Sequence, residues 1–309
     1  MPRPTLFDSN AFLFQEGQPR SLSMIIAIDI ATGRVLGKLG LEVEGNAAAS
    51  TSKAPYGLFW WETKEVRDRL LMQTQSLLLH KGIERLNWRN APDCYGREED
   101  WLENWQETWR ETFQNTAIED SNFHLNIQTS TTFKHLLPAD QARALAKAKA
   151  AIGKIEVAES PDWEVIFPIY EASRTAKGFE QSMTLVSFKT VQSNLSAAYK
   201  VIVCYEKSGL VAGWALLVEV SKETFYLFIT ANNPARHGSY SPTLAIIEFA
   251  YHNAQQNGGK ILDLGTASKE GEVNEGVFAF KKSIGAVLGS KKTHLISIDK
   301  LDRKNEGGF

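Results

Sequence analysis

The sequence predicts two related α/β domains in tandem, each a mixed, largely antiparallel sheet flanked by helices, in the α/β (α+β) class. The chain has 309 residues, a length that suits two domains better than one. Hydrophobic residues make up 43% and charged residues 23%, as in ordinary globular proteins, so a buried core can form. The third observation is that the sequence resembles itself at an offset of 176 residues.

The repeat begins with a predicted β-hairpin. Residues 25–37 resemble residues 201–213, and in each run short stretches rich in β-branched residues flank a Thr-Gly or Ser-Gly turn. The turn glycines Gly33 and Gly209 lie 176 positions apart. We therefore expect the same hairpin in both halves.

A helix and two strands follow each hairpin at the same offset. Apolar residues at helical spacing predict amphipathic helices, and Gly82 and Gly258 stand where such a helix would need a left-handed C-terminal residue. Each copy then has a predicted strand and a closing strand: 85–88 and 124–127 in the first, 261–264 and 295–298 in the second.

The segment between the copies is rich in Ala and Lys, and it predicts a linker helix over 133–154. Further helices over 163–174 and 185–199 belong to the second copy alone. We place the N-terminal domain at residues 1–130 and the C-terminal domain, with the linker helix, at 131–309. The second domain is the fuller one and the better candidate for chemistry.

Charge and composition narrow the partners. Lys and Arg number 34 against 36 Asp and Glu, a net charge of −2 that argues against nucleic-acid binding, even through the lysines of the linker helix. No apolar run reaches the 18–20 residues or so of a membrane span, so a cytoplasmic location is expected. Two cysteines and six scattered histidines predict no metal site.

Several strings in the second half, taken in order, resemble the FemAB-like branch of the GNAT (acyl-CoA N-acyltransferase) superfamily. They lie at 139–149, 167–174, 238–244, 262–265 and 276–286. The resemblance implies two GNAT-like domains in tandem and transfer of an acyl or aminoacyl group to an amine, on a small molecule or peptide, in an interdomain cleft. No heptad pattern marks a coiled-coil arm, so an aminoacyl-tRNA donor is less favoured than acyl-CoA.

The resemblance also implies a phosphate-binding loop of the form Gln/Arg-x-x-Gly-x-Gly/Ala. Here Gly238 fits, whereas Ala235 and Tyr240 do not. Gly238, Ser239 and Ser241 are the candidate acyl-CoA contacts, although capping of the following helix is the favoured role for the two serines. The departures leave open a second reading, a non-catalytic ligand-binding protein that keeps the fold.

Asp263 and Tyr240 are the candidate catalytic residues. Asp263 lies near the carboxyl end of a predicted strand, where it could orient an amine or accept its proton. The alternative is a structural carboxylate bonded to loop N–H groups beside Gly265. Tyr240 could donate a proton to the leaving group, or it could fill space between the domains.

The candidate substrate-binding residues are basic. The resemblance implies this role for Lys281 in the string Phe-Lys-x-x-x-Gly, and because Lys281 and Lys282 are adjacent on a predicted helix, one of them could face the cleft. Arg236 could bind an anion. The aromatic segment 88–109, with tryptophans every four residues at its end, is interpreted as packing rather than as a stacking platform.

Overall fold

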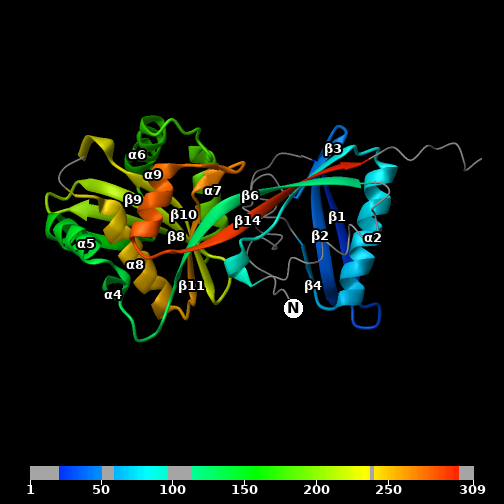
Figure 1. Cartoon of the computed structure of the whole chain (residues 1–309), viewed down its shortest axis with the longest axis horizontal. Helices are drawn as coiled ribbons and strands as arrows, with labels where there is room; N and C mark the ends of the chain where they lie inside the picture. The colour runs from blue at the N-terminus through cyan, green and yellow to red at the C-terminus, as the bar shows by residue number, and fades with distance from the viewer. Residues whose placement is uncertain (1–20, 51–58, 97–112, 237–239, 299–309) are drawn as a thin grey trace, which may run out of the picture.

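The computed structural model describes residues 21–50, 59–96, 113–236 and 240–298, and it confirms the mixed α/β fold. One sheet of twelve strands runs through these residues in the order β1-β2-β3-β5-β14-β6-β11-β10-β9-β8-β7, with β4 paired to β2. Figure 1 shows two lobes side by side, and the two long strands β6 and β14 run from one lobe into the other.

The first lobe packs one helix on a small sheet. Its elements are β1 (Ser21–Ile28), β2 (Val35–Glu44), β3 (Ala47–Ala49), β4 (Phe59–Trp61), α2 (Lys64–His80), β5 (Arg85–Arg89) and the short helix η2 (Asp93–Tyr95). Thr63 caps α2 by accepting from the N–H of Val66. Leu70, Leu71 and Leu78 of α2 are buried against the sheet, which is why the helical spacing of apolar residues predicted this element.

The second lobe contains most of the helices. Its elements are β7 (Ile152–Ala158), α6 (Trp163–Ala176), α7 (Leu185–Leu195), β8 (Tyr199–Glu206), β9 (Val211–Glu219), β10 (Thr224–Asn232), η3 (Pro234–Arg236), α8 (Pro242–Gln256), β11 (Ile261–Thr266), β12 (Ser268–Lys269), β13 (Glu272–Val273) and α9 (Glu275–Ser283). Strands β8 and β9 are buried on both faces, so helices cover both sides of the sheet.

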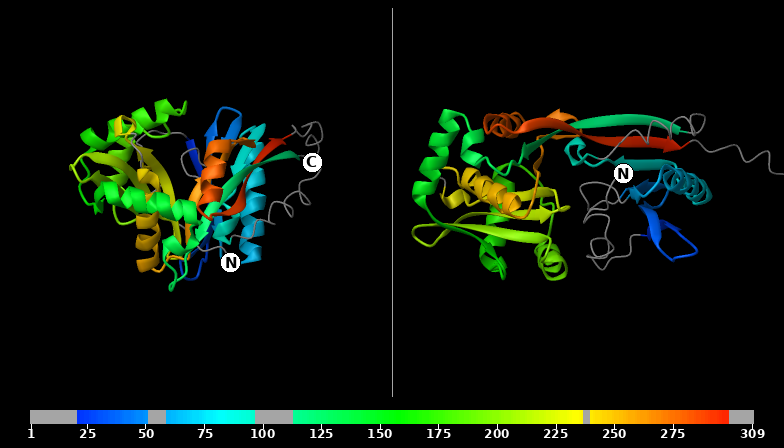
Figure 2. Two further views of the ribbon diagram at one scale, coloured as in Figure 1. Left: turned by 60° about the vertical axis from the view of Figure 1, so that its left-hand side comes forward. Right: turned by 90° about the horizontal axis from the view of Figure 1, so that it is seen from below.

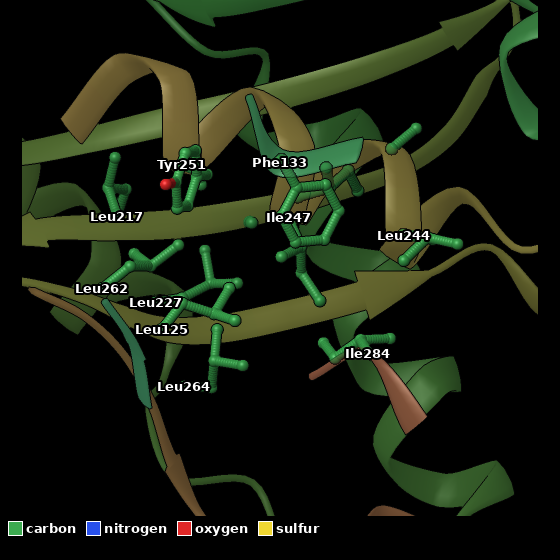
Figure 3. Close-up of a cluster of buried hydrophobic side chains, with 14 of the residues drawn as sticks. Leu125, Phe133, Leu217, Leu227, Leu244, Ile247, Tyr251, Leu262, Leu264 and Ile284 are labelled. Atoms are coloured by element: carbon green, nitrogen blue, oxygen red, sulfur yellow. The ribbon is translucent and has the colours of Figure 1, made fainter. Parts of the chain in front are cut away.

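Two hydrophobic clusters lie on the two faces of this sheet. On one face α8 packs on residues such as Leu217 and Leu262, with Phe133 and Tyr251 in contact (Figure 3). On the other face α6 and α7 enclose Trp214, whose indole contacts Trp163 and Phe188. The second lobe therefore has a rigid frame around its central strands.

The strands that close the two halves are shared between them. β6 (Phe113–Asn126) and β14 (Val287–Ile298) pair antiparallel along their lengths, and β6 also pairs with β11 while β14 pairs with β5. Figure 2 shows both strands running along one side of the two lobes. The sequence predicted that 295–298 closes the second copy, whereas this strand pairs with β5 of the first. The division at residue 130 stays a prediction.

The two halves have matching backbone features at the predicted offset of 176 residues. Gly33 and Gly209 both have positive φ in the turns of hairpins β1-β2 and β8-β9, and Gly82 and Gly258 both have positive φ after α2 and α8. In the shared ladder, Ile118 pairs with Thr293. The positions 176 residues from these two, His294 and Ala117, also pair with each other, as a two-fold relation between the halves requires.

A third glycine pair, Gly37 and Gly213, gives a stability prediction. A Cβ on Gly37 would lie 2.8 Å from the carbonyl oxygen of Trp60, and a Cβ on Gly213 would lie 2.8 Å from that of Ala231. Because each contact is with the backbone of a paired strand, we expect Gly37→Ala and Gly213→Ala each to lower the free energy of unfolding by about 1–3 kcal/mol. Urea unfolding measures this.

The matched control is Gly276→Ala at the start of α9, where the nearest atom to a new Cβ is 3.7 Å away. This change should be neutral or slightly stabilising. Equal midpoints for Gly37→Ala, Gly213→Ala and wild type would contradict the close approach of the strands.

The linker prediction needs correction. Instead of one helix over 133–154, the chain forms α4 (Phe133–Leu136) and α5 (Ala139–Ala151), and residues 152–154 belong to β7. Pro138 separates the two helices because the residue before a proline avoids the helical conformation. The predicted helix over 185–199 likewise ends earlier, at Leu195, and Tyr199 starts β8.

His294 belongs to a buried polar group in the first lobe. It lies on β14 and is 8% exposed, with Nε2 3.3 Å from the Nδ2 atom of Asn90 and Nδ1 3.1 Å from that of Asn115. Burial, and secondarily the charge of Lys292, lowers the pKa of His294 from 6.5 to about 4. The native state therefore holds a neutral imidazole here.

This lowered pKa predicts acid sensitivity. Above pH 6.5 the histidine is neutral in both states, whereas between pH 6.5 and pH 4 only the unfolded chain takes up the proton, so stability is lost as the pH falls. We expect a loss of about 2 kcal/mol from this residue, since one pKa unit corresponds to about 1.4 kcal/mol and solvent screening reduces the effect.

Urea unfolding at pH 7 and pH 4 checks this. His294→Gln should reduce the acid loss, and His80→Gln at the exposed end of α2 should not. Parallel pH dependences for His294→Gln and wild type would rule out the contribution of this residue.

Candidate active site

Asp263 is buried at the centre of the shared sheet. It is the third residue of β11, is 1% exposed, and its strand lies between β10 and β6. Its Oδ1 accepts from Asn122 Nδ2 at 2.9 Å and from the N–H of Gly265 at 2.7 Å, and its Oδ2 accepts from Tyr95 Oη at 2.8 Å. Burial raises the pKa of Asp263, and these three donors together with Lys281 partly offset that effect.

The hydrogen bond from the N–H of Gly265 agrees with the alternative prediction for Asp263, a structural carboxylate bonded to loop N–H groups. The carboxylate is held by donors on three sides rather than projecting toward solvent. It comes from the second half of the chain, whereas Tyr95 and Asn122 come from η2 and β6 in the first half. Asp263 therefore joins the two halves through hydrogen bonds.

Lys281 points inward from α9. Its side chain is buried at 8% exposed, and its Nζ donates to the carbonyl oxygens of Gly265 at 2.8 Å and Thr266 at 2.9 Å. The neighbouring Lys282 is exposed. Burial lowers the pKa of Lys281 from 10.5 to about 8, and the nearby charge of Asp263 opposes this shift. Lys281 is thus a mostly protonated, desolvated ammonium group at neutral pH.

The turn at Gly265 brings Asp263 and Lys281 to the same place. The pairing of β11 with β6 shifts register between Asp263 and Gly265, and Gly265 has a φ of +76°. A Cβ here would lie 3.3 Å from the ring of Tyr226. Glycine therefore permits a bulge whose N–H faces the carboxylate and whose carbonyl faces the ammonium.

Other titratable groups surround this bulge. Burial lowers the pKa of His124, and the charges of Asp263 and Asp93 oppose this shift. Burial raises the pKa of Cys94, and the same two charges raise it further. On β14, burial and the charge of Arg89 lower the pKa of Lys291 to about 8, while Asp263 and Asp120 oppose the shift. Titratable groups with shifted pKa values gather in this way at functional sites, and buried ion networks shift pKa values as well.

Tyr240 lies apart from this group. It directly precedes the N-cap of α8, and its hydroxyl donates to Glu206 Oε1 at 2.7 Å at the end of β8. The tyrosine that contacts Asp263 is Tyr95. The structure thus brings together Asp263 and Lys281 among the predicted site residues, and it gives Tyr240 a different partner.

The predicted acyl-CoA loop is described in part. Gly238 and Ser239 lie outside the described residues, and Arg236 ends η3. Helix α8 begins at Pro242, as the loop prediction required, with Ser241 as its N-cap residue. The Ser241 side chain makes no capping hydrogen bond, so capping does not account for it. These four residues stay predictions as ligand contacts.

Sequence reasoning missed Tyr95 and Asn122. The sequence predicts that Tyr95, as part of the aromatic segment 88–109, is a packing residue, and Tyr95 does pack against the cluster around Trp214. The sequence could not indicate that the Tyr95 hydroxyl bonds Asp263, because the two residues are 168 positions apart. The tryptophans at 101, 105 and 109 lie outside the described residues.

Comparison with known proteins identifies the fold. The sequence matches no family model and no curated protein. The structure is similar to that of FemX, with a TM-score of 0.65 and 12% identity over 90% of this chain and 89% of FemX. It is also similar to the C-terminal domain of a protein assigned as a lysylphosphatidylglycerol synthetase from Agrobacterium fabrum, with a TM-score of 0.61 and 11% identity over 95% and 88% of the two chains.

A third similar structure is a tandem GNAT protein from the clavulanic acid biosynthesis pathway. Its TM-score is 0.50 and its identity 11%, over 91% of this chain and 84% of that chain. The chain therefore has a FemAB-like GNAT fold, as its strings predicted. Within the described residues, no helix is both long and apolar enough to cross a membrane.

Proposed function

We propose that this protein transfers an acyl or aminoacyl group from an activated ester or thioester to an amine, with Lys281 at the reacting carbonyl. The proposal depends on one observation above all, the buried ammonium of Lys281 held by the carbonyls of Gly265 and Thr266. A desolvated cation is a strong donor for an oxygen that gains negative charge in the transition state.

The chemistry assigns one hydrogen of Lys281 to the substrate. Two of the three Nζ hydrogens are directed to the carbonyl oxygens of Gly265 and Thr266. Within the described residues the third hydrogen has no protein acceptor, so it is available to a ligand. When the amine nitrogen attacks the carbonyl carbon, the carbonyl oxygen becomes an oxyanion. The third N–H can donate to that oxyanion, and the bond from carbon to the sulfur or oxygen of the leaving group then breaks.

The nucleophile must lose a proton in this reaction. A neutral amine attacks, and the proton of the resulting ammonium passes to the leaving thiolate or alkoxide, directly or through water. We assign Asp263 to the orientation of the site rather than to proton transfer, because its carboxylate already accepts three hydrogen bonds and is 1% exposed. Proton transfer by Asp263 stays the competing proposal.

The experiment is a transfer assay with two kinds of donor. Purified protein is incubated with acyl-CoA thioesters in one arm and aminoacyl-tRNA esters in the other, each with a panel of amines and amine-bearing peptides, and N-acylated product is detected by mass spectrometry. Product in either arm that is lost in Lys281→Met supports the proposal and identifies the donor. Thermal stabilisation by a donor without product in any arm would favour the non-catalytic binding protein.

A further inference from the structure

Three hydrogen bonds in series connect the first half of the chain to Lys281. Tyr95 Oη donates to Oδ2 of Asp263, the N–H of Gly265 donates to Oδ1 of Asp263, and Lys281 Nζ donates to the carbonyl oxygen of Gly265. The donor–acceptor distances are 2.8, 2.7 and 2.8 Å. Each link supports the next, because donors hold the carboxylate on both oxygens, and Gly265 is bonded through its N–H on one side and through its C=O on the other.

We propose that Tyr95 is a positioning residue, which sets the place and the ionisation of Lys281 through Asp263 and the Gly265 bulge. This inference rests on the proposed function for its consequence in catalysis, but the arrangement itself can be tested without substrate. It means that the first half of the chain completes the site in the second half, although α9 and β11 both belong to the second.

The anchor of Tyr95 is itself fixed. Asp93, two residues before it in η2, accepts from the N–H of Ser290 on β14 at 2.9 Å. A Cβ on Gly289 would lie 2.4 Å from Oδ1 of Asp93, so a side chain at this position would displace the Asp93 carboxylate from Ser290. The short helix η2 is therefore held against the shared strand β14, and this contact aims Tyr95 at Asp263.

Among the described residues, titratable groups face this series of bonds from four elements. Asp93 and Cys94 come from η2, His124 from β6, Tyr226 from β10 and Lys291 from β14. For Lys281 itself, Asp263 is the charged neighbour that matters, and it favours the protonated form. A variant that disturbs Asp263 should thus change the pKa of Lys281.

The test measures the pKa of Lys281 by NMR in protein labelled with ¹³C at lysine Cε, with the resonance assigned from Lys281→Arg. In Tyr95→Phe the carboxylate loses its Oδ2 donor, although Asn122 and Gly265 still hold Oδ1. Its charged form is then less favoured and its position less fixed, so it supports the bulge and the ammonium of Lys281 less well. We expect the pKa of Lys281 to fall by about one unit. In the transfer assay, turnover should fall about tenfold or more with little change in the Michaelis constant.

Two further variants decide the interpretation. Tyr170→Phe is the control. It removes a tyrosine hydroxyl that lies 2.9 Å from the Ser182 hydroxyl in the lobe that contains Lys281, and it should leave the pKa of Lys281 unchanged. Gly289→Ala disturbs the anchor of η2 and should lower the pKa of Lys281 as Tyr95→Phe does. An unchanged Lys281 pKa in folded Tyr95→Phe overturns the proposal, whatever the transfer assay gives. A lowered pKa in a protein without transfer activity would uphold the positioning and reject the proposed function alone.

Discussion

Replacing Lys281 with methionine is expected to lower the turnover number of the proposed transfer by about 10²–10³-fold, the loss typical when one oxyanion donor is removed. Methionine keeps the length of the side chain and suits a buried site, so the change removes the ammonium while α9 remains packed. Steady-state kinetics with the donor and amine found in the transfer assay measure the effect.

The matched control is Lys282→Met on the same turn of α9, because Lys282 is exposed. This variant should keep the wild-type rate. If Lys281 instead binds an anionic group on either substrate, Lys281→Met should raise the Michaelis constant and leave turnover unchanged. A variant with both constants unchanged would remove Lys281 from the site.

The two lysines illustrate how far a sequence pattern can go. Adjacent positions on a helix differ by about 100° in direction, so the pair at 281 and 282 predicted that one side chain turns inward. The pattern could not choose between them. The choice depends on how α9 packs over the end of β11, which brings Lys281 to the carbonyls of Gly265 and Thr266.

The fold was predictable because the repeat marks its own turning points. Glycine is favoured where the backbone takes a positive φ after a helix or in a tight hairpin, so Gly33, Gly82 and their partners recur at one offset. The exchange of closing strands left no such mark. The side-chain pattern of a strand indicates which of its faces is buried. It does not indicate which strand lies beside it, because strands pair through backbone N–H and C=O groups that nearly all residues share.

The sequence predicted the part of the candidate site that lies within one segment. It did not predict the contacts between segments far apart in the chain. Asp263 and Gly265 are neighbours in sequence, and their hydrogen bond was foreseen as the structural alternative. Tyr95 and Asn122 reach Asp263 only through the shared strands and η2, which bring together residues more than 140 positions apart. No local pattern encodes that meeting.

Asp263→Ala is expected to cause the largest loss of stability at the site, about 3–5 kcal/mol in the free energy of unfolding. The change leaves Tyr95 Oη, Asn122 Nδ2 and the N–H of Gly265 without their acceptor in a place from which solvent is excluded. A buried donor without a partner costs about 1–3 kcal/mol. Urea unfolding at pH 7 measures the loss.

Asp263→Asn separates stability from charge. Its amide oxygen can still accept, but its NH₂ group must face one of the three donors, so we expect a smaller loss of stability than in Asp263→Ala. The wild-type carboxylate has a raised pKa, so its ionisation opposes folding as the pH rises above 3.8. Asp263→Asn should therefore compare more favourably with wild type at pH 7 than at pH 3.5.

The same variant decides the role of Asp263 in transfer. If Asp263 accepts the proton of the amine, turnover should fall by about 10²–10⁴-fold in Asp263→Asn, while Tyr95→Phe, which keeps the carboxylate, should retain most activity. If Asp263 instead orients the bulge that holds Lys281, the two variants should lower turnover together. The double variant should then lose little more than Asp263→Asn alone, because both changes break one connected series of hydrogen bonds. Additive losses in the double variant would show that Tyr95 and Asp263 act independently.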